Sequence, residues 1–342
     1  MQNSTKRSRP ESGADDSIPA FTRLADLASA RVGGRALATN DDFFASKSNL
    51  VKPEPPIFIP GKYTTRGKWM DGWESRRRRT PGHDWCVVKL GMRGRVRGFD
   101  VDTRFFTGNF PSECSIEALD APKAFRVTLP WTTILPKTPL TGDSHNFLPL
   151  EDDRPWTHLR LNIFPDGGVA RLRVYGDVVV DWPRVAPGRR AVDLAAVWHG
   201  GLVLDASDVH YGATNNMLMP GRARNMGDGW ETKRRRGPGH DWAIVRLGAP
   251  GMLTRIEIDT NHFKGNYPDR ASVEGCFVPG ASLEALSSAS WLEVLRESKL
   301  RAHHRHLYAK ELHHRGPVSH LRLNIFPDGG VSRFRVHGTL AR

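Results

Sequence analysis

The sequence predicts an all-β protein built from two tandem β-sandwich domains, and three observations support this fold class. The chain repeats itself, because HLRLNIFPDGGV occurs at residues 158–169 and again at 320–331. Apolar and polar residues alternate within each copy, and this period of two is typical of half-buried antiparallel strands. The 24 prolines and 33 glycines are spread between the short strand-like segments, where they supply the turns that a sandwich needs.

The internal duplication extends well beyond this identical segment. DGWESRRRRTPGHDW at 71–85 matches DGWETKRRRGPGHDW at 228–242. FDVDTRFFTGNFP likewise matches IEIDTNHFKGNYP later in the chain. The segments that begin with DLASARVGG and DLAAVWHGG align without a gap, after which the second copy is ten residues shorter than the first. The protein is therefore a duplicated unit of about 150 residues per copy.

The domain boundaries follow from this alignment and from local composition. Residues 1–22 are polar and are expected to form a disordered tail. The first repeat is assigned to residues 23–185 and the second to residues 186–342, because the Pro-rich stretch 182–190 separates the two copies. The N-terminal residues lack the apolar stretch of a signal peptide, so we expect a cytoplasmic protein that has no membrane anchor.

Alternation assigns side chains to the two faces of each strand. In the strand at 158–164 the apolar side chains share the core face, and the polar ones share the other face: His158, Arg160 and Asn162. If the Pro-Asp-Gly-Gly turn at 165–168 joins two paired strands, the next strand brings Arg171 and Arg173 close to these residues. Guanidinium groups bind carboxylates through paired hydrogen bonds, so such a face suits a small carboxylate ligand.

Composition leaves two classes of partner open. The net charge of +13 fits a nucleic-acid-binding protein, but it also fits an enzyme with an anionic substrate. The arginine run at 76–79 contains no aromatic residue, which makes it a poor match to a groove that follows a single strand, so no nucleic-acid partner is expected. Three cysteines without C-x-x-C spacing argue against a disulfide framework and against a zinc site.

Taken together, these motifs resemble the allantoicase (allantoate amidinohydrolase) family. The likeness rests on DGWE followed by a basic run and GHDW, on FDVDTRFFTGNFP, on NDDFFASKSNLVKP and on HLRLNIFPDGGVARLRVYG, and it covers about residues 25–342. The resemblance implies two tandem jelly-roll β-sandwich domains of the galactose-binding-like kind. It also implies a hydrolase of purine (allantoin) degradation that converts the small-molecule substrate allantoate to ureidoglycolate and urea. A homo-oligomer is expected.

The reaction requires an acid for the departing urea and a base for water. The candidate catalytic residues are Glu74, His83 and Asp102 in the first repeat, with the counterparts Glu231, His240 and Asp259. Which of them is the acid and which the base stays open at this point. The candidate substrate-binding residues are Arg160, Arg173, Asn109, Asn162, Arg322, Arg335, Asn266 and Asn324.

No cofactor and no tightly bound metal are expected, since no H-E-x-x-H motif or Cys/His spacing occurs. Metal-free catalysis and a carboxylate-rich divalent site both remain possible. The histidine-rich stretch 301–314 departs from the first copy, which suggests that the two repeats differ in function. The alternative from another class is a non-catalytic pair of sandwiches that bind a carbohydrate or a protein.

Overall fold

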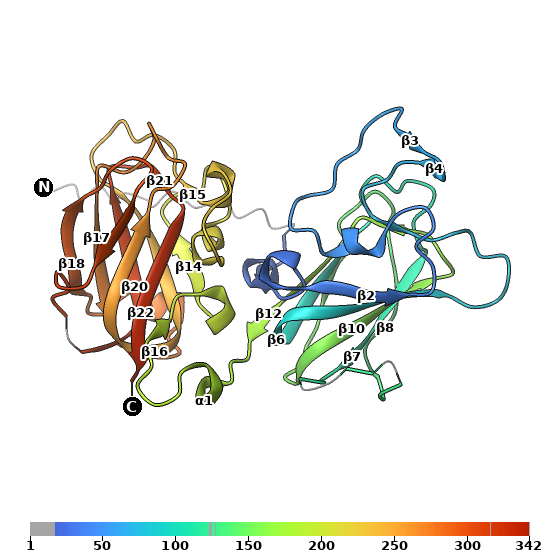
Figure 1. The fold of residues 1–342 in the computed structure, drawn as a ribbon, viewed down its shortest axis with the longest axis horizontal. Coiled ribbons are helices and arrows are strands. Elements are labelled where there is room, and N and C mark those ends of the chain that lie inside the picture. Colours follow the sequence, from blue (N-terminus) through green and yellow to red (C-terminus); the bar gives the residue numbers. More distant parts are fainter. Residues whose placement is uncertain (1–17, 123–124, 127, 315, 342) are drawn as a thin grey trace, which may run out of the picture.

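A computed structural model describes residues 18–122, 125–126, 128–314 and 316–341. Two β-sandwiches lie side by side and are joined by a linker that contains the short helix α1 (Trp182–Val185) (Figure 1). Most of the predicted N-terminal tail lies outside the described residues, and its last residues enter the 3-10 turn η1 (Ala20–Arg23). None of the helices in the described ranges is long and apolar enough to cross a membrane.

The elements of the two repeats follow each other in a matching order. Those of the first repeat are β1 (Ala25–Asp26), η2 (Ala30–Val32), β2 (Arg35–Thr39), η3 (Lys47–Val51), β3 (Tyr63–Thr64), β4 (Gly67–Lys68), β5 (Trp73–Glu74), β6 (Asp84–Asp102), β7 (Glu113–Leu119), β8 (Thr132–Pro139), β9 (Phe147–Pro149), β10 (Pro155–Phe164), β11 (Gly168–Val169) and β12 (Arg171–Val178). Those of the second are β13 (Val192–Asp193), η4 (Val197–His199), β14 (Leu202–Ala206), η5 (Thr214–Leu218), η6 (Met226–Asp228), β15 (Trp230–Glu231), β16 (Asp241–Asp259), β17 (Arg270–Cys276), α2 (Leu283–Ser287), β18 (Leu292–Lys299), β19 (Arg305–Tyr308), β20 (Pro317–Phe326), β21 (Gly330–Val331) and β22 (Arg333–Leu340).

The long strand β6 belongs to both layers of the first sandwich. Its first half pairs with β2 and β10, and β10 continues the layer to β7 and β8. Its second half pairs with β9 and β12, and β12 pairs with β1. Strand β16 does the same in the second repeat, where the order β13-β22-β16-β20-β17-β18 reproduces β1-β12-β6-β10-β7-β8. The predicted class of two tandem jelly-roll sandwiches is confirmed.

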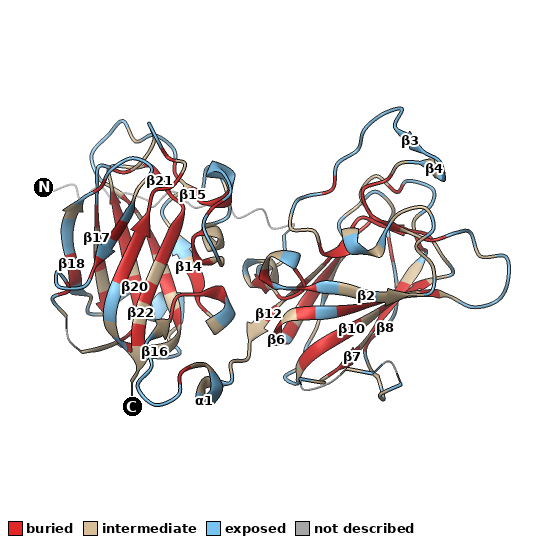
Figure 2. Ribbon diagram, in the orientation of Figure 1, coloured by how far each residue is buried: buried red, intermediate tan, exposed pale blue. Residues whose placement is uncertain are grey.

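Alternation along the strands produces the two hydrophobic cores. Leu159, Leu161 and Ile163 of β10 are fully buried, as are Phe99 and Val101 on the facing half of β6. Buried residues run along the inner surfaces of both sandwiches, and exposed residues gather at the loops (Figure 2). The period of two in the sequence therefore marks a real division between a core face and an outer face.

The conditional pairing across the Pro-Asp-Gly-Gly turn is not formed. Strands β10 and β12 are not neighbours, because β6 lies between them: β10 pairs mainly with residues 84–89 of β6, and β12 pairs with residues 94–102. The glycines of the turn are engaged elsewhere: Gly168 pairs with Glu74, and its N–H donates to the carbonyl of Asn109 at 2.7 Å. The chain thus crosses from one layer to the other, and Arg173 lies on the opposite layer from Arg160.

A buried arginine fixes the DGWE turn to each sandwich. Arg171 is 1% exposed, and it donates to the carbonyl of Asp71 at 2.7 Å and to its carboxylate at 2.7 Å. Arg171 also donates a hydrogen bond to the carbonyl of Glu54 at 2.9 Å. Burial alone would raise the pKa of Asp71, but the hydrogen bonds from Arg171 and Lys52 outweigh it and hold the pKa below its ordinary value. Arg333 binds Asp228 in the same way in the second repeat.

Contacts also couple the repeats to each other. Arg31 of the first repeat forms an ion pair with Asp228 of the second and donates to the side chain of Asn216 at 3.2 Å. The indole of Trp198 donates to the carbonyl of Val32 at 3.2 Å. Asp228 thus receives an arginine from each repeat, so the second DGWE turn is part of the interface between the two sandwiches.

Removal of the Arg171 guanidinium tests this anchoring. Arg171→Met leaves the Asp71 carboxylate buried without its main partner, so the free energy of unfolding should fall by about 3–5 kcal/mol in urea denaturation. The control is Arg79→Met, at an exposed arginine, which should change the value by less than about 0.5 kcal/mol. Equal stability of the two variants would show that Arg171 does not hold the DGWE turn in place.

Candidate active site

The DGWE turn places the Glu74 side chain at the loop end of the first sandwich. Its neighbour Trp73 is fully buried and donates its indole N–H to the carbonyl of Asp41 at 2.8 Å. The Glu74 backbone pairs with Gly168 on one side and exchanges hydrogen bonds with Ala45 on the other, at 3.1 and 3.3 Å. The two-residue strand β5 is therefore held from both sides, and the carboxyl group has little freedom to move.

The first repeat brings two of the predicted residues together. The Asn109 amide donates to Oε1 of Glu74 at 2.7 Å. Asn109 lies on the loop 103–111, which packs so closely on the turn that side chains at Gly167 and Gly168 would not fit. A Cβ on Gly168 would lie 1.9 Å from the Phe106 ring. The glycines of the repeated Pro-Asp-Gly-Gly motif are thus explained by close packing beneath the site.

A cavity of about 310 Å³ opens next to this pair. It is lined by Phe44, Lys68, Met70, Glu74, Phe105, Thr107, Gly108 and Asn109. Burial raises the pKa of Glu74 above its ordinary value, although the hydrogen bond from Asn109 and the charge of Lys68 oppose the shift. The cavity therefore combines a carboxyl group of raised pKa, an ammonium group and a primary amide.

This arrangement can bind an anion and transfer a proton to it. Lys68 supplies a positive charge for a carboxylate, and the amide of Asn109 has the donor and acceptor that a ureido group needs. A carboxyl group with a raised pKa is a suitable general acid near neutral pH. Oε2 of Glu74 has no hydrogen-bond partner among the described residues, so it is available to a ligand.

A second group of predicted residues lies elsewhere, on the outer face of the layer that contains β10. Arg160 forms an ion pair with Glu117 at 2.6 Å, and the Asn162 amide donates to the same carboxylate at 2.9 Å. His83 packs against Phe164 in a tilted arrangement, with ring centroids 4.7 Å apart. Burial raises the pKa of Glu117, but its bonds to Arg160 and Asn162 bring the value below normal. These side chains bind each other, but the buried Oδ1 of Asn162 has no hydrogen-bond partner among the described residues.

A third group, Asp102 and Arg173, lies on the outer face of the opposite layer. Asp102 is buried and binds the Arg104 guanidinium at 2.7 Å and the Arg104 N–H at 2.9 Å. Arg173 donates to the backbone carbonyls of Lys52 and Pro53 at 2.5 and 3.1 Å. Both residues are engaged in fixing loops, and neither lines the cavity beside Glu74.

The second repeat forms the same three groups. Glu231 accepts a hydrogen bond from Asn266, and Asp259 and Arg335 share a cleft. The counterpart of the Arg160 group, on the layer that contains β20, again has all its members: His240, Arg322, Asn324 and Glu274. The difference lies beside Glu231, because β3 and β4 have no counterpart among the described elements of the second repeat. Asn266 contacts the sulfur of Met226 at 3.9 Å.

One set of side chains has the spacing of metal ligands. Oxygen and nitrogen atoms of Asp100, Asp102 and His145 lie within 4.8 Å of one another. His145 is bound to Asp100 at 2.7 Å, and Arg104 already neutralises Asp102. In the second repeat Arg305 pairs with Glu257 at 2.6 Å at the equivalent place. Arg104 and Arg305 thus each neutralise a carboxylate at this place, while Oδ1 of Asp100 is buried and has no hydrogen-bond partner among the described residues.

Lys68 and Glu117, with its counterpart Glu274, were not among the predicted residues. Lys68 lies in the segment that only the first copy contains, where a comparison of the copies gives no signal. Glu117 was detectable, because Ser-Ile-Glu at 115–117 matches Ser-Val-Glu at 272–274 on a strand of alternating pattern. An arginine on a strand is stabilised by an acidic residue on the neighbouring strand, and Glu117 lies directly opposite Arg160.

Comparisons with known proteins agree with this picture. A family model described as the allantoicase repeat matches residues 25–179 and again 192–341. A probable allantoicase of Burkholderia mallei is 52% identical over 96% of this chain and 98% of its own length. A probable allantoicase of Pseudomonas aeruginosa is 49% identical over 93% of this chain and 97% of its own length. The crystal structure of allantoicase from Saccharomyces cerevisiae superposes with a TM-score of 0.78 at 36% identity and covers 92% of this chain and 93% of that one. The chain belongs to the allantoicase family.

Proposed function

We propose that the Glu74 cavity of the first repeat is the site at which this protein hydrolyses allantoate to ureidoglycolate and urea. Family membership supports the activity, which is that of a hydrolase acting on a carbon–nitrogen bond of a linear amidine in purine degradation. The observation that carries the choice of site is the carboxyl group of raised pKa, hydrogen-bonded to Asn109 and close to Lys68.

Each functional group of the substrate has a partner in this cavity. Allantoate carries one carboxylate and two ureido groups on a central carbon. In the proposed pose Lys68 binds the carboxylate, and Asn109 binds a ureido group by its donor and acceptor. Protonated Glu74 then donates through Oε2 to the nitrogen of the departing ureido group. Bond cleavage releases urea, while the lone pair of the remaining ureido nitrogen stabilises the central carbon.

The same carboxyl group can complete the reaction. After it has given up its proton, the Glu74 carboxylate accepts a proton from water as the water oxygen bonds to the central carbon. The products are urea and ureidoglycolate, and Glu74 returns to its protonated state. One residue thus acts first as acid and then as base, so the scheme does not require His83 or Asp102 to reach the substrate.

We also propose that the first repeat is the working copy. The hairpin of β3 and β4 supplies Lys68, and it projects over the loop end of the first sandwich (Figure 1). The second repeat keeps the pair of Glu231 and Asn266, but no such hairpin occurs among its described elements. Its lysine in this region, Lys264, instead stands at the position of Thr107 on the facing loop, so the charge would approach a substrate from another side, and we assign the second pair a structural role.

The remaining expectations stay predictions. A nucleic-acid role is disfavoured because Arg76 pairs with Asp41 at 2.6 Å and Arg78 with Asp84 at 3.3 Å, which engages half of the basic run. A cytoplasmic location and a homo-oligomer remain predicted, and large exposed apolar side chains such as Tyr63 (70%) offer surface for self-association. A purely binding role is less consistent with the family.

Matched substitutions in the two repeats test the proposed site. Glu74→Gln keeps the acceptor for Asn109 but removes the transferable proton, so kcat for urea release should fall on the order of 10²-fold or more. Glu231→Gln is the control and should leave kcat within about twofold of the wild type. The opposite ranking would place catalysis in the second repeat, and no urea release from the wild-type protein would favour the binding role.

The role of Lys68 predicts a loss of binding more than a loss of chemistry. Lys68→Gln should raise KM for allantoate by about tenfold with a smaller change in kcat, because the ammonium contacts a carboxylate that does not react. Lys62→Gln is the control from the same loop, since both lysines lie over an aromatic ring but Lys62 does not line the cavity. An unchanged KM in Lys68→Gln would contradict the proposed pose.

The raised pKa of Glu74 predicts a pH-dependent stability difference. The folded protein holds this proton more tightly than the unfolded chain, whose glutamate titrates near 4.5. The contribution of Glu74 to stability therefore falls as pH rises from this value through the raised pKa. Glu74→Gln should gain stability over the wild type at pH 7, and this gain should shrink toward pH 4 in thermal unfolding. A gain that does not depend on pH would refute the shift, and exposed Glu151→Gln is the surface control.

A further inference from the structure

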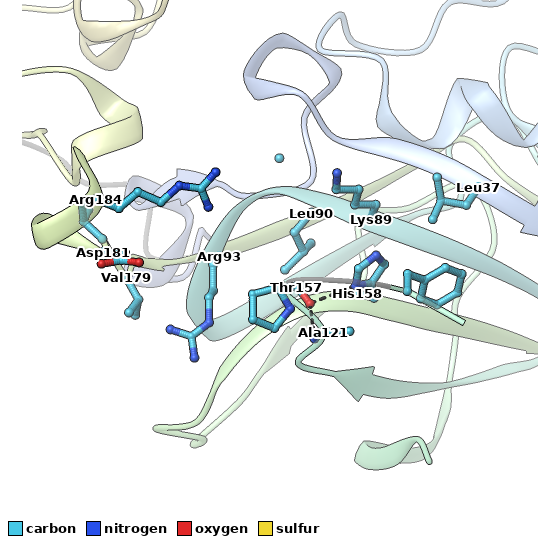
Figure 3. Close-up of a pocket in the computed structure, with 14 residues that line it drawn as sticks. Leu37, Lys89, Leu90, Arg93, Ala121, Thr157, His158, Val179, Asp181 and Arg184 are labelled. Atoms are coloured by element: carbon cyan, nitrogen blue, oxygen red, sulfur yellow. Dashed lines mark hydrogen bonds between the residues drawn. The ribbon is translucent and has the colours of Figure 1, made fainter. Parts of the chain in front are cut away.

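A second cavity, of about 750 Å³, lies between the first repeat and the linker. It shares no lining residue with the Glu74 cavity. Figure 3 shows Lys89 and His158 on one side, the linker residue Arg184 on the other, and Arg93 between them. The proposed reaction uses none of these side chains, so the cavity calls for a separate explanation.

The polar groups of this cavity are predominantly cationic. Arg93 is neutralised by Asp120, at 2.7 Å. Lys89 and Arg184 are exposed, and neither forms an ion pair with any residue in the described ranges. The lining contains one carboxylate, that of Asp181. Lys89 and Arg184 therefore supply two positive charges without an ion pair, against one negative charge from Asp181, so an anion that enters the cavity meets a lining of net positive charge.

A buried imidazole forms part of the wall. His158 is 3% exposed, and its Nδ1 lies 2.9 Å from the hydroxyl of Thr157. Lys89 is the residue directly opposite His158 on the neighbouring strand. Burial and then the charge of Lys89 lower the pKa of His158, which keeps the ring neutral near pH 7. The ring stacks on Phe125, with centroids 4.5 Å apart, and lies on the same side of the cavity as Lys89.

The second repeat has kept the same construction. A smaller cavity of about 230 Å³ is lined by Arg246, Ser319 and His320, at the positions of Lys89, Thr157 and His158. The Nδ1 of His320 lies 3.0 Å from the Ser319 hydroxyl. Its Nε2 is buried and has no hydrogen-bond partner among the described residues. A hydroxyl, an imidazole and a cation thus recur at the same place in both sandwiches.

Apolar side chains complete the wall in the first repeat: Leu37, Pro122, Val179 and Val180. Pockets that join a few convergent polar groups to an apolar lining are typical of small-molecule sites. We propose that this cavity binds a small organic carboxylate with an apolar body, whose carboxylate lies between Lys89 and Arg184. The ligand would link a strand of the first repeat to the linker, and the site is independent of the Glu74 chemistry.

Calorimetric titration of the full-length protein with benzoate tests the proposal, and benzamide is the uncharged probe of the same shape. Benzoate should bind with millimolar affinity or tighter, and benzamide about tenfold more weakly. Lys89→Gln and Arg184→Gln should each weaken benzoate binding by about tenfold. Lys310→Gln removes an exposed lysine elsewhere and should leave binding unchanged.

Three results would overturn the proposal. The first is the absence of any heat of binding up to high millimolar benzoate, and the second is equal affinity for benzoate and benzamide. The third is unaltered benzoate binding in both Lys89→Gln and Arg184→Gln. Loss of benzoate binding in Lys68→Gln but not in Lys89→Gln would assign the probe to the Glu74 cavity instead. Because Lys89 and Arg184 are exposed, their replacement should not prevent folding, and thermal unfolding of each variant confirms this.

Discussion

The buried guanidinium of Arg171 is the contact on which the candidate site depends. It binds both the carbonyl and the carboxylate of Asp71, so the turn that follows has a fixed position relative to β12. Trp73 then fills the core, and Glu74 emerges at the loop end with its backbone paired on both sides. A buried charge pair of this kind is a costly way to gain stability, but it specifies one geometry. The repeated arginine of the GGV-x-R motif is thus structural, although it lies next to functional residues in the sequence.

Duplication has copied this scaffold, but the surroundings of the glutamate differ between the two copies. Arg333 anchors Asp228 as Arg171 anchors Asp71, and Glu231 meets Asn266 as Glu74 meets Asn109. The second turn has gained a different connection, because Asp228 also pairs with Arg31 of the first repeat. The shorter loop removes the hairpin that carries Lys68. We propose that the first copy binds the substrate anion beside Lys68, whereas the second turn contributes to the contact between the sandwiches.

Much of the fold could be predicted because it depends on local patterns. Alternation identified the faces of β10 and β6, and the exact repeat of HLRLNIFPDGGV established the duplication. The conditional pairing of β10 and β12 is not formed, because the glycines of the turn motif serve close packing on Phe106 instead of a hairpin. Residue types did not reveal this, because the packing partner is about 60 residues away in the chain.

The candidate site could be predicted only in part, because it also depends on contacts between distant segments of the chain. Glu74 and Asn109 could both be selected by chemistry, but their hydrogen bond is a tertiary contact between two loops. Arg160 and Asn162 were placed correctly on an outer face, yet Glu117 on the adjacent strand already binds them both. Sequence reasoning grouped them with Glu74 because it could not tell which layer each strand joins.

The most direct test of this account is a crystal structure of the Glu74→Gln protein soaked with allantoate. The account predicts one substrate molecule in the first repeat, with its carboxylate next to Lys68 and a ureido group on Asn109, and an empty position beside Glu231. Allantoate bound beside Arg160 and Glu117, or equally in both repeats, would contradict the assignment of the active site to the Glu74 cavity.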